Sequence, residues 1–185
     1  MTASNVIRSV FLGNITGGPT VNESVTNSVV TGGGNPLGND WIINGTSNVT
    51  LSITGYRQDV GRGGLGFLCF DNTRTAALLN NLNVTNCNAE GIFLVASNTS
   101  ILKSRLQNSR LTGNGNSGYE ISSSETSQAC LRLTNNTSDR YRFFQFDNST
   151  LTVENFGNLT TENIGNITIL AGNVTNAAVG SCQIP

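Results

Sequence analysis

Residues that can bind a ligand through charge and hydrogen bonds are concentrated in the stretch 56–64. The candidates there are Tyr56, Arg57, Asp59 and Arg62. This stretch breaks a regular spacing, because Ile53 and Phe67 are fourteen residues apart whereas the corresponding strands later in the chain are eight apart. Insertions that protrude from a repeat commonly carry binding function. We therefore predict a binding loop for a sugar or a peptide, the alternative being a loop with no binding role.

Two arginines outside this stretch, Arg110 and Arg132, occupy matching positions in successive repeats. Matching positions stack on one another, so we expect the two guanidinium groups to be neighbours on an outer face, with Glu154 diagonally near Arg132. Such a pair can grip a carboxylate or sulfate group of a surface glycan. The alternative is that both side chains are simply solvated.

Catalytic, metal and cofactor chemistry are not expected. The eleven acidic residues are scattered, and the one suggestive pair is Glu90 and Asp139, each two residues before a strand of the same type. Strand spacing puts this pair about 10 Å apart, slightly beyond the range of an inverting glycosidase pair. Solvated carboxylates are the expected role. The chain has no histidine and no zinc-type cysteine spacing.

The chain contains four cysteines, which are Cys69, Cys87, Cys130 and Cys182. An even number in a chain rich in Asn and Thr favours disulfides and an oxidising compartment, and four cysteines allow three pairings. We predict Cys130–Cys182, which would tie down the C-terminal tail, and Cys69–Cys87. The alternative is four buried free thiols.

Twelve N-x-[ST] patterns make N-glycosylation a further expectation. They include Asn44, Asn83, Asn136, Asn148 and Asn166. Many arise from a recurring triplet of Asn, an apolar residue and Thr, in which both polar residues point outward. The pattern alone therefore does not establish that a glycan is attached.

Composition places these residues in one β-rich domain. Of 185 residues only 11% are charged and 37% hydrophobic, with 21 glycines and a net charge of −1. The ordered alternation of apolar residues argues against disorder, and no Gly-X-Y period indicates collagen. A nearly neutral chain lacks the basic face that nucleic acid requires. No apolar run is long enough for a transmembrane helix, and no signal peptide is recognised.

Two strand patterns repeat along the chain. The first recurs at 51–55, 82–86, 110–113, 131–135 and 151–155, and the second at 67–69, 92–94, 119–121 and 141–143. Three successive copies keep eight residues between the first pattern and the second, as stacked turns of a coil require. The first pattern ends on Gly55, Asn86, Gly113, Asn135 or Asn155, residue types that tolerate positive φ. The sequence predicts a right-handed parallel β-helix.

Alternation along the strands assigns the core and the domain limits. The residues expected to point inward are Phe67, Cys69, Leu82, Val84, Ile92, Leu94, Leu111, Tyr119, Ile121, Leu131, Leu133, Tyr141, Phe143, Leu151 and Val153. We expect β-helix turns over 41–156, an irregular N-terminal segment of strands or linker over 1–40, and a C-terminal cap over 157–185. A cap is needed because an open end exposes pairing edges.

The repeat over 41–156 resembles the right-handed parallel β-helix superfamily of pectate lyases and autotransporter passengers. The segment 129–136, followed by Cys182, is similar to the end of large secreted bacterial β-helix proteins. The chain lacks the G-G-x-G-x-D repeats of calcium-binding β-rolls. The resemblance implies the C-terminal part of a larger secreted or surface-attached protein.

The expected function is that of an extracellular or cell-surface structural and adhesion module without catalysis. Its partners would be a surface glycan or a protein, or further copies of the chain that pair through exposed strand edges. One alternative is a self-assembling filament subunit in which the segment 6–30 pairs with a neighbour. The other is a carbohydrate-active enzyme, a lyase or hydrolase, which would need a clustered acidic groove.

Overall fold

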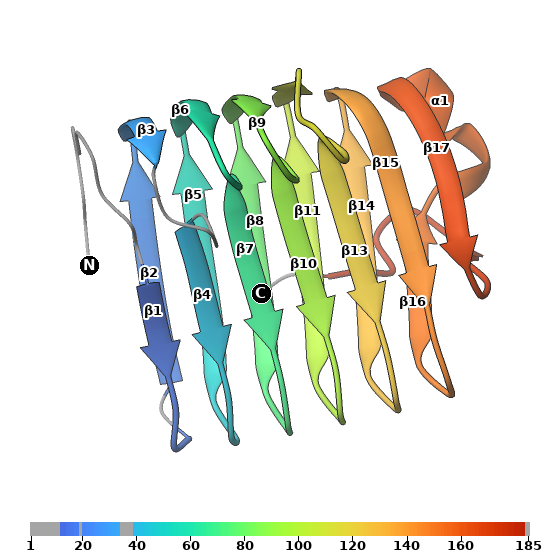
Figure 1. Ribbon diagram of the computed structural model, residues 1–185. Helices are drawn as coiled ribbons and strands as arrows, with labels where there is room; N and C mark the ends of the chain where they lie inside the picture. The colour runs from blue at the N-terminus through green and yellow to red at the C-terminus, as the bar shows by residue number, and fades with distance from the viewer. Residues whose placement is uncertain (1–11, 19, 34–38, 184–185) are drawn as a thin grey trace.

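The computed structural model describes residues 12–18, 20–33 and 39–183, and these wind into a parallel β-solenoid of about six turns (Figure 1). Strands of successive turns lie side by side and pair in parallel. A short helical segment, η1 (Phe156–Asn158) and α1 (Leu159–Glu162), follows the last complete turn. The predicted all-β parallel β-helix is confirmed.

One wall of the coil is a seven-stranded sheet in which strands of successive turns pair in parallel. Its strands, in spatial order, are β2 (Thr20–Thr26), β5 (Asn48–Thr54), β8 (Arg74–Asn80), β11 (Ile101–Gln107), β14 (Gln128–Thr134), β16 (Thr150–Glu154) and β18 (Thr175–Ala177).

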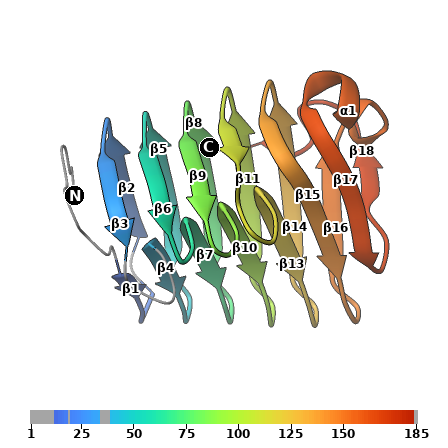
Figure 2. The same ribbon diagram turned by 45° about the horizontal axis from the view of Figure 1, so that its top comes forward.

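The other walls are two arms of an eleven-stranded sheet that meet at the long strand β15 (Thr137–Gln145). The first arm contains β1 (Leu12–Ile15), β4 (Asn39–Ile43), β7 (Leu65–Cys69), β10 (Ile92–Ala96) and β13 (Tyr119–Ser123). The second arm contains β3 (Val29–Gly33), β6 (Arg57–Gly61), β9 (Asn83–Cys87) and β12 (Arg110–Thr112). β17 (Ile164–Ala171) pairs with β15 at the end of the sheet. Figure 2 shows the three walls from a second direction.

Each turn contains up to three strands, one in each wall, whereas the sequence repeat predicted two strands per turn. The first sequence pattern mixes two walls, because 51–54, 131–134 and 151–154 lie in the seven-stranded sheet whereas β9 and β12 lie in the second arm. Both columns alternate apolar inward with polar outward residues, so their sequence patterns coincide. The second pattern forms one column, as Ile92, Tyr119 and Tyr141 pair in register.

A turn is shorter when its second-arm strand and its first-arm strand are one continuous strand. Arg74, Ile101 and Gln128 are equivalent and 27 residues apart, but the next equivalent residue, Thr150, follows after 22. The shorter turn contains β15, which runs from the second arm into the first without a connecting loop.

The predicted left-handed corners are confirmed. Gly55, Asn86, Gly113, Asn135 and Asn155 all have positive φ, between 53° and 72°. They form two different corners, because Asn86 lies near the end of the second-arm strand β9 and Gly113 follows the second-arm strand β12, whereas the other three follow strands of the seven-stranded sheet.

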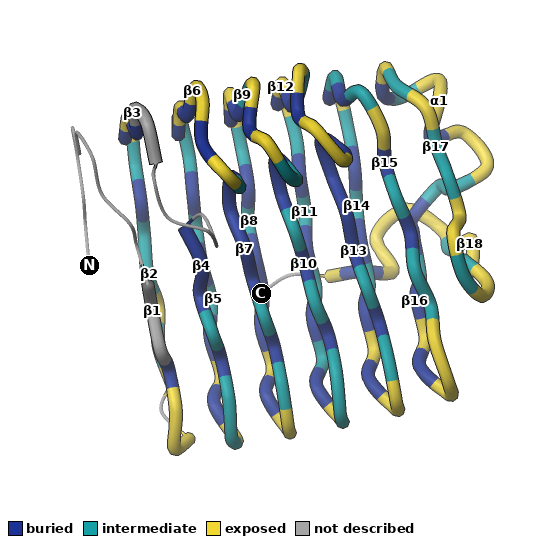
Figure 3. Tube along the Cα trace, viewed as in Figure 1, coloured by how far each residue is buried: buried dark blue, intermediate teal, exposed yellow. Residues whose placement is uncertain are grey.

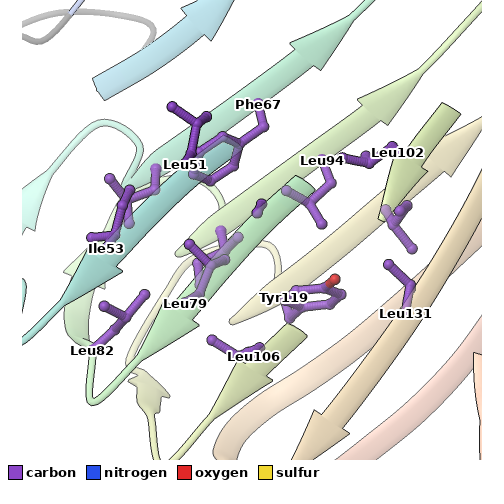
Figure 4. Packing of buried hydrophobic residues seen from close by; sticks show 14 of the residues in the cluster. Leu51, Ile53, Phe67, Leu79, Leu82, Leu94, Leu102, Leu106, Tyr119 and Leu131 are labelled. Atoms are coloured by element: carbon purple, nitrogen blue, oxygen red, sulfur yellow. The ribbon is translucent and has the colours of Figure 1, made fainter. Parts of the chain in front are cut away.

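Buried residues recur in every turn of the described coil (Figure 3), and Figure 4 shows how some of their side chains pack in the interior. Every residue that the sequence assigned to the interior is buried. Equivalent residues stack on one another, as in the parallel pair of the Trp41 and Phe67 rings, whose centroids are 5.2 Å apart. The burial of these stacked columns is the main stabilising term for a coil in which each turn contacts only its neighbours.

The coil extends on both sides of the predicted 41–156 range. β2 and β3 pair with β5 and β6, so the described part of 1–40 already forms a turn, while residues 1–11 lie outside the described residues. At the other end β17 and β18 continue the stacking. No helix among the described residues is long and apolar enough to cross a membrane.

Candidate functional site

The stretch 56–64 is part of the coil and not a protruding loop, which corrects the predicted insertion. Residues 57–61 form β6 and pair with β3 and β9. Tyr56 is only 1% exposed. Its hydroxyl donates to Gln58 at 2.6 Å and accepts from Asn39 at 2.6 Å. Tyr56 therefore holds the corner together and is not available to a ligand.

The other three candidates of this stretch are exposed on the second arm or just after it. Asp59 is already engaged, because its Oδ1 accepts hydrogen bonds from Thr85 at 3.0 Å and from Asn86 at 2.7 Å in the next turn. Arg62 lies in the connection to β7. Arg57 begins β6 with its side chain outward.

The structure brings Arg57 close to Arg110, a pairing that the sequence did not predict. Both pair with Asn83, which lies between them in the β6–β9–β12 column. The two arginines are thus two turns apart, about 10 Å along the coil. They line an open depression of about 450 Å³ on the second arm, together with Asn83 and Thr137. No ion pair to either arginine is recorded within the described residues.

Three asparagines with positive φ also line this depression. Asn81, Asn108 and Asn135 have φ near 55° and occupy the same corner of three turns. Asn135 donates to Asn108 at 2.8 Å, and Asn108 donates to Asn80 at 3.0 Å. These amides were not predicted as site residues. The signal was present in the 27-residue spacing of the three asparagines, but the two-strand interpretation concealed it.

Arg132 lies elsewhere, which corrects the expected Arg110–Arg132 pair. It belongs to β14, where its neighbour in the adjacent turn is Arg105. The predicted proximity of Glu154 is confirmed, since Arg132 Nε lies 3.7 Å from Glu154 Oε2. A second ion pair joins Arg132 to Glu162 at 2.5 Å and keeps the pKa of that carboxyl below its usual value. Arg132 therefore anchors the end of the coil.

One of the two predicted disulfides is present. Cys130 and Cys182 are joined, with 5.3 Å between their Cα atoms. The Cys69–Cys87 prediction is wrong, because both are free and buried. They lie on β7 and β9, strands of different arms with β8 between them in the chain. Burial raises the pKa of Cys69 to about 12 and that of Cys87 to about 11, so both stay protonated thiols.

The acidic pair considered for catalysis is engaged in corner hydrogen bonds. Glu90 accepts from Asn116 at 2.7 Å, and Asp139 accepts from the backbone N–H of Asn114 at 3.2 Å. Across residues 12–18, 20–33 and 39–183, no three His, Cys, Asp or Glu side chains are close enough to hold a metal ion.

The candidate glycosylation sites differ in access. Asn83, Asn148 and Asn166 are exposed, and Asn44 is half-buried. Asn136 is 2% exposed, and its amide nitrogen donates to Leu106 O and to Asn163 Oδ1, both at 2.9 Å. A glycan on Asn136 is therefore incompatible with this structure.

No protein-family model matches the chain, and no curated protein or solved structure does. The solenoid architecture hosts many unrelated activities. The chemistry of the depression that contains Arg57 and Arg110 is consequently the main guide to function.

Proposed function

We propose that the chain is a structural and adhesive module of an extracellular or cell-surface protein, which binds acidic groups of a surface glycan through Arg57 and Arg110. The observation that carries this proposal is two exposed arginines held two turns apart on one wall of the coil, neither of which forms an ion pair with a described residue. The role corresponds to the display function of the secreted β-helix proteins that the repeat resembles.

The chemistry of the depression suits an acidic sugar. Guanidinium groups bind carboxylate and sulfate through paired hydrogen bonds. The amide of Asn83 and the hydroxyl of Thr137, which line the same depression, can donate to and accept from sugar hydroxyls. The Cys130–Cys182 disulfide supports an oxidising compartment outside the cell.

The test is binding to immobilised heparin and polygalacturonate, with dextran as the neutral comparison, using protein that carries no glycan on Asn83. Arg57→Gln and Arg110→Gln should each weaken binding several-fold, and added salt should weaken it further. Arg74→Gln removes an exposed arginine from a different wall and should leave binding unchanged. Equal binding by all variants, or equal retention on dextran, would refute the proposal.

A second candidate function, self-assembly into filaments, is favoured by the end strand β17. β17 pairs on one side with β15, and its other edge has no partner strand among the described residues. Ile164 is 70%, Ile169 45% and Leu170 46% exposed there. A second copy is the natural occupant, since its first turn offers parallel strands with the same spacing.

Sedimentation over a range of concentrations, followed by electron microscopy, tests self-assembly. The wild type should associate at high concentration and form fibres. A variant with Ile164→Lys and Ile169→Lys should stay monomeric, because charged residues on an edge strand oppose pairing. A wild type that remains a monomer at high concentration would exclude this function.

A further inference from the structure

A small hollow lies on the outer surface of the first arm, away from the arginine depression. It has a volume of about 190 Å³. Its centre follows one outward column of three successive turns, Asp40 on β4, Gly66 on β7 and Phe93 on β10. Gly66 leaves the space open, because a Cβ at this position would come within 2.0 Å of Asp40 Oδ1. Glu90 contributes a second carboxylate to the lining.

Asp40 is the unusual member of the hollow. Its side chain belongs to a residue that is only 7% exposed. No hydrogen bond or ion pair to its carboxylate is found within the described part of the chain. Burial raises the pKa of Asp40 to about 6. A buried carboxylate without a partner is costly, and such groups are normally paired with a donor or a cation.

The lining offers hydrogen-bond acceptors but no side-chain donors. Apart from Asp40 and Glu90 it consists of glycine, alanine, leucine and phenylalanine. Glu90 uses one oxygen to accept from Asn116, which leaves the other free. The ring of Phe93 adds an aromatic face suited to a cation. A donor-only, positively charged group complements this lining, whereas a sugar hydroxyl would also need a donor from the protein.

Further along the same outward column, another buried carboxylate has a cationic partner. Glu120 follows Phe93 in the column and Arg142 follows Glu120. The Arg142 guanidinium lies 3.0 Å from Glu120 and forms an ion pair with it. Glu120 is about as buried as Asp40, but its cation comes from the chain itself. At Asp40 no such cation is found among the residues that the structure describes.

We propose that this hollow is a binding site for the cationic head group of a lysine or arginine side chain on a partner protein, held by Asp40 and Glu90 and packed against Phe93. The volume is below that of pockets for drug-sized ligands, which suits a single side-chain head group. This interaction goes beyond the glycan binding proposed for the second arm, and it uses a different wall of the coil.

The experiment is an NMR titration of the full chain at pH 7.5 with three peptides, Ac-Gly-Lys-Gly-NH₂, its arginine counterpart and its norleucine counterpart. A fourth arm uses n-butylammonium to separate a free amine from a peptide side chain. We expect the lysine or the arginine peptide to shift resonances of residues 40, 66, 90 and 93, and the norleucine peptide to shift none. Binding of butylammonium as tight as that of both peptides would contradict a protein partner.

Variants locate the site. Asp40→Asn keeps the shape of the side chain and should weaken peptide binding about tenfold or more, and Glu90→Gln should weaken it less. Glu125→Gln changes net charge equally at an exposed corner that is not part of the hollow and should bind like the wild type. If Asp40→Asn retains its fold and binds as tightly as the wild type, the proposal is wrong.

Phe93→Leu provides a second variant that preserves an apolar residue and removes only the aromatic face. It should weaken binding about two- to fivefold, in line with the loss of one cation–π contact. Heparin binding is measured on the same samples. Loss of peptide binding with heparin binding intact would leave the function proposed for the second arm untouched.

Discussion

Among the acidic residues of this coil, Asp40 combines burial with the lack of a hydrogen bond or ion pair to its carboxylate within the described chain. Most outward acids are satisfied by the next turn, as Asp59 is by Thr85 and Asn86. Asp40 is buried by its surroundings without gaining a donor in the described chain, so its charged form is destabilised. The Asp40 carboxyl should therefore make the free energy of unfolding depend on pH.

We predict that Asp40→Asn becomes more stable relative to the wild type as pH rises. Because the folded pKa of about 6 is above the unfolded value of 3.8, the wild type has no penalty below pH 3.8, loses stability as the pH rises from 3.8 to about 6, and has a constant penalty at higher pH. The difference in unfolding free energy between pH 4 and pH 8 should be about 1–3 kcal/mol. Urea unfolding at the two pH values measures it.

Two facts make this prediction specific to Asp40. Among the described residues, Glu90 is the one other titratable group that lines the hollow, and the residue of β1 that pairs with Asp40 is Leu12. Glu90→Gln serves as the control and should show a smaller difference between the two pH values. An Asp40→Asn variant with the same relative stability at pH 4 and pH 8 would show that this carboxyl titrates normally.

At the level of strands and corners, buried asparagines close the coil on the inside of its turns. Asn136 Oδ1 accepts from Ser109 N at 3.0 Å, and Asn163 Oδ1 accepts from Asn136 N at 3.1 Å in the next turn. Asn114 makes the corresponding pair of bonds to Cys87 N and Val84 O, both at 3.1 Å. Each of these side chains satisfies backbone groups that the corner leaves without a partner.

Asn136→Ala should lower the free energy of unfolding by about 2–4 kcal/mol, because it leaves several buried backbone groups unsatisfied. Asn148→Ala removes an exposed asparagine and should change stability by less than about 0.5 kcal/mol. Chemical denaturation of both variants provides the comparison. Equal stability of the two would mean that the corner bonds are replaced by water.

The sequence was sufficient for the fold but not for the placement of its outer surface. Alternation identifies inward residues in any wall, so the buried set, including Phe67 and Tyr119, was predicted correctly. Alternation does not say which wall a strand belongs to, and the mixed columns separated Arg110 from Arg57 and placed it beside Arg132. Which outward residues become neighbours depends on how the strands of successive turns pair, and the alternation pattern does not reveal that pairing.

The same limit explains the misplaced loop at Tyr56. A tyrosine next to two arginines and an aspartate has the composition of a binding loop. The buried hydroxyl of Tyr56 accepts a hydrogen bond from Asn39 on β4 and donates one to Gln58 on β6. Such a contact across a corner has no local sequence signal.

The whole molecule is a stack whose last turns are fastened back onto earlier ones. The C-terminal stretch turns back across the seven-stranded sheet (Figure 1). Cys182 is bonded to Cys130 on β14, its backbone N–H donates to Glu154 on β16, and Lys103 on β11 donates to Gln183 O at 2.9 Å. The tail thereby contacts three successive strands of one wall.

Replacing both Cys130 and Cys182 by serine should lower the stability of the chain by up to about 4 kcal/mol, the loop-closure value for a link across 52 residues. Reduction of the wild type should produce a similar loss, whereas the variant should not respond to reductant. Hydrogen exchange should localise the added opening to β16, β18 and the tail. Faster exchange spread evenly over all turns would contradict a local fastening.

The link between Cys130 and Cys182 also determines how the protein bears a mechanical load. Tension applied to the chain beyond Cys182 enters the coil at β14, because the covalent bond carries it past β15, β16, η1, α1, β17 and β18. The last turns are therefore spared from being peeled away one hydrogen bond at a time. The pull falls on a strand that is held on both sides, by β11 and β16. In the adhesive role proposed above, this link would keep the end turns folded under a pulling force that would otherwise unravel them.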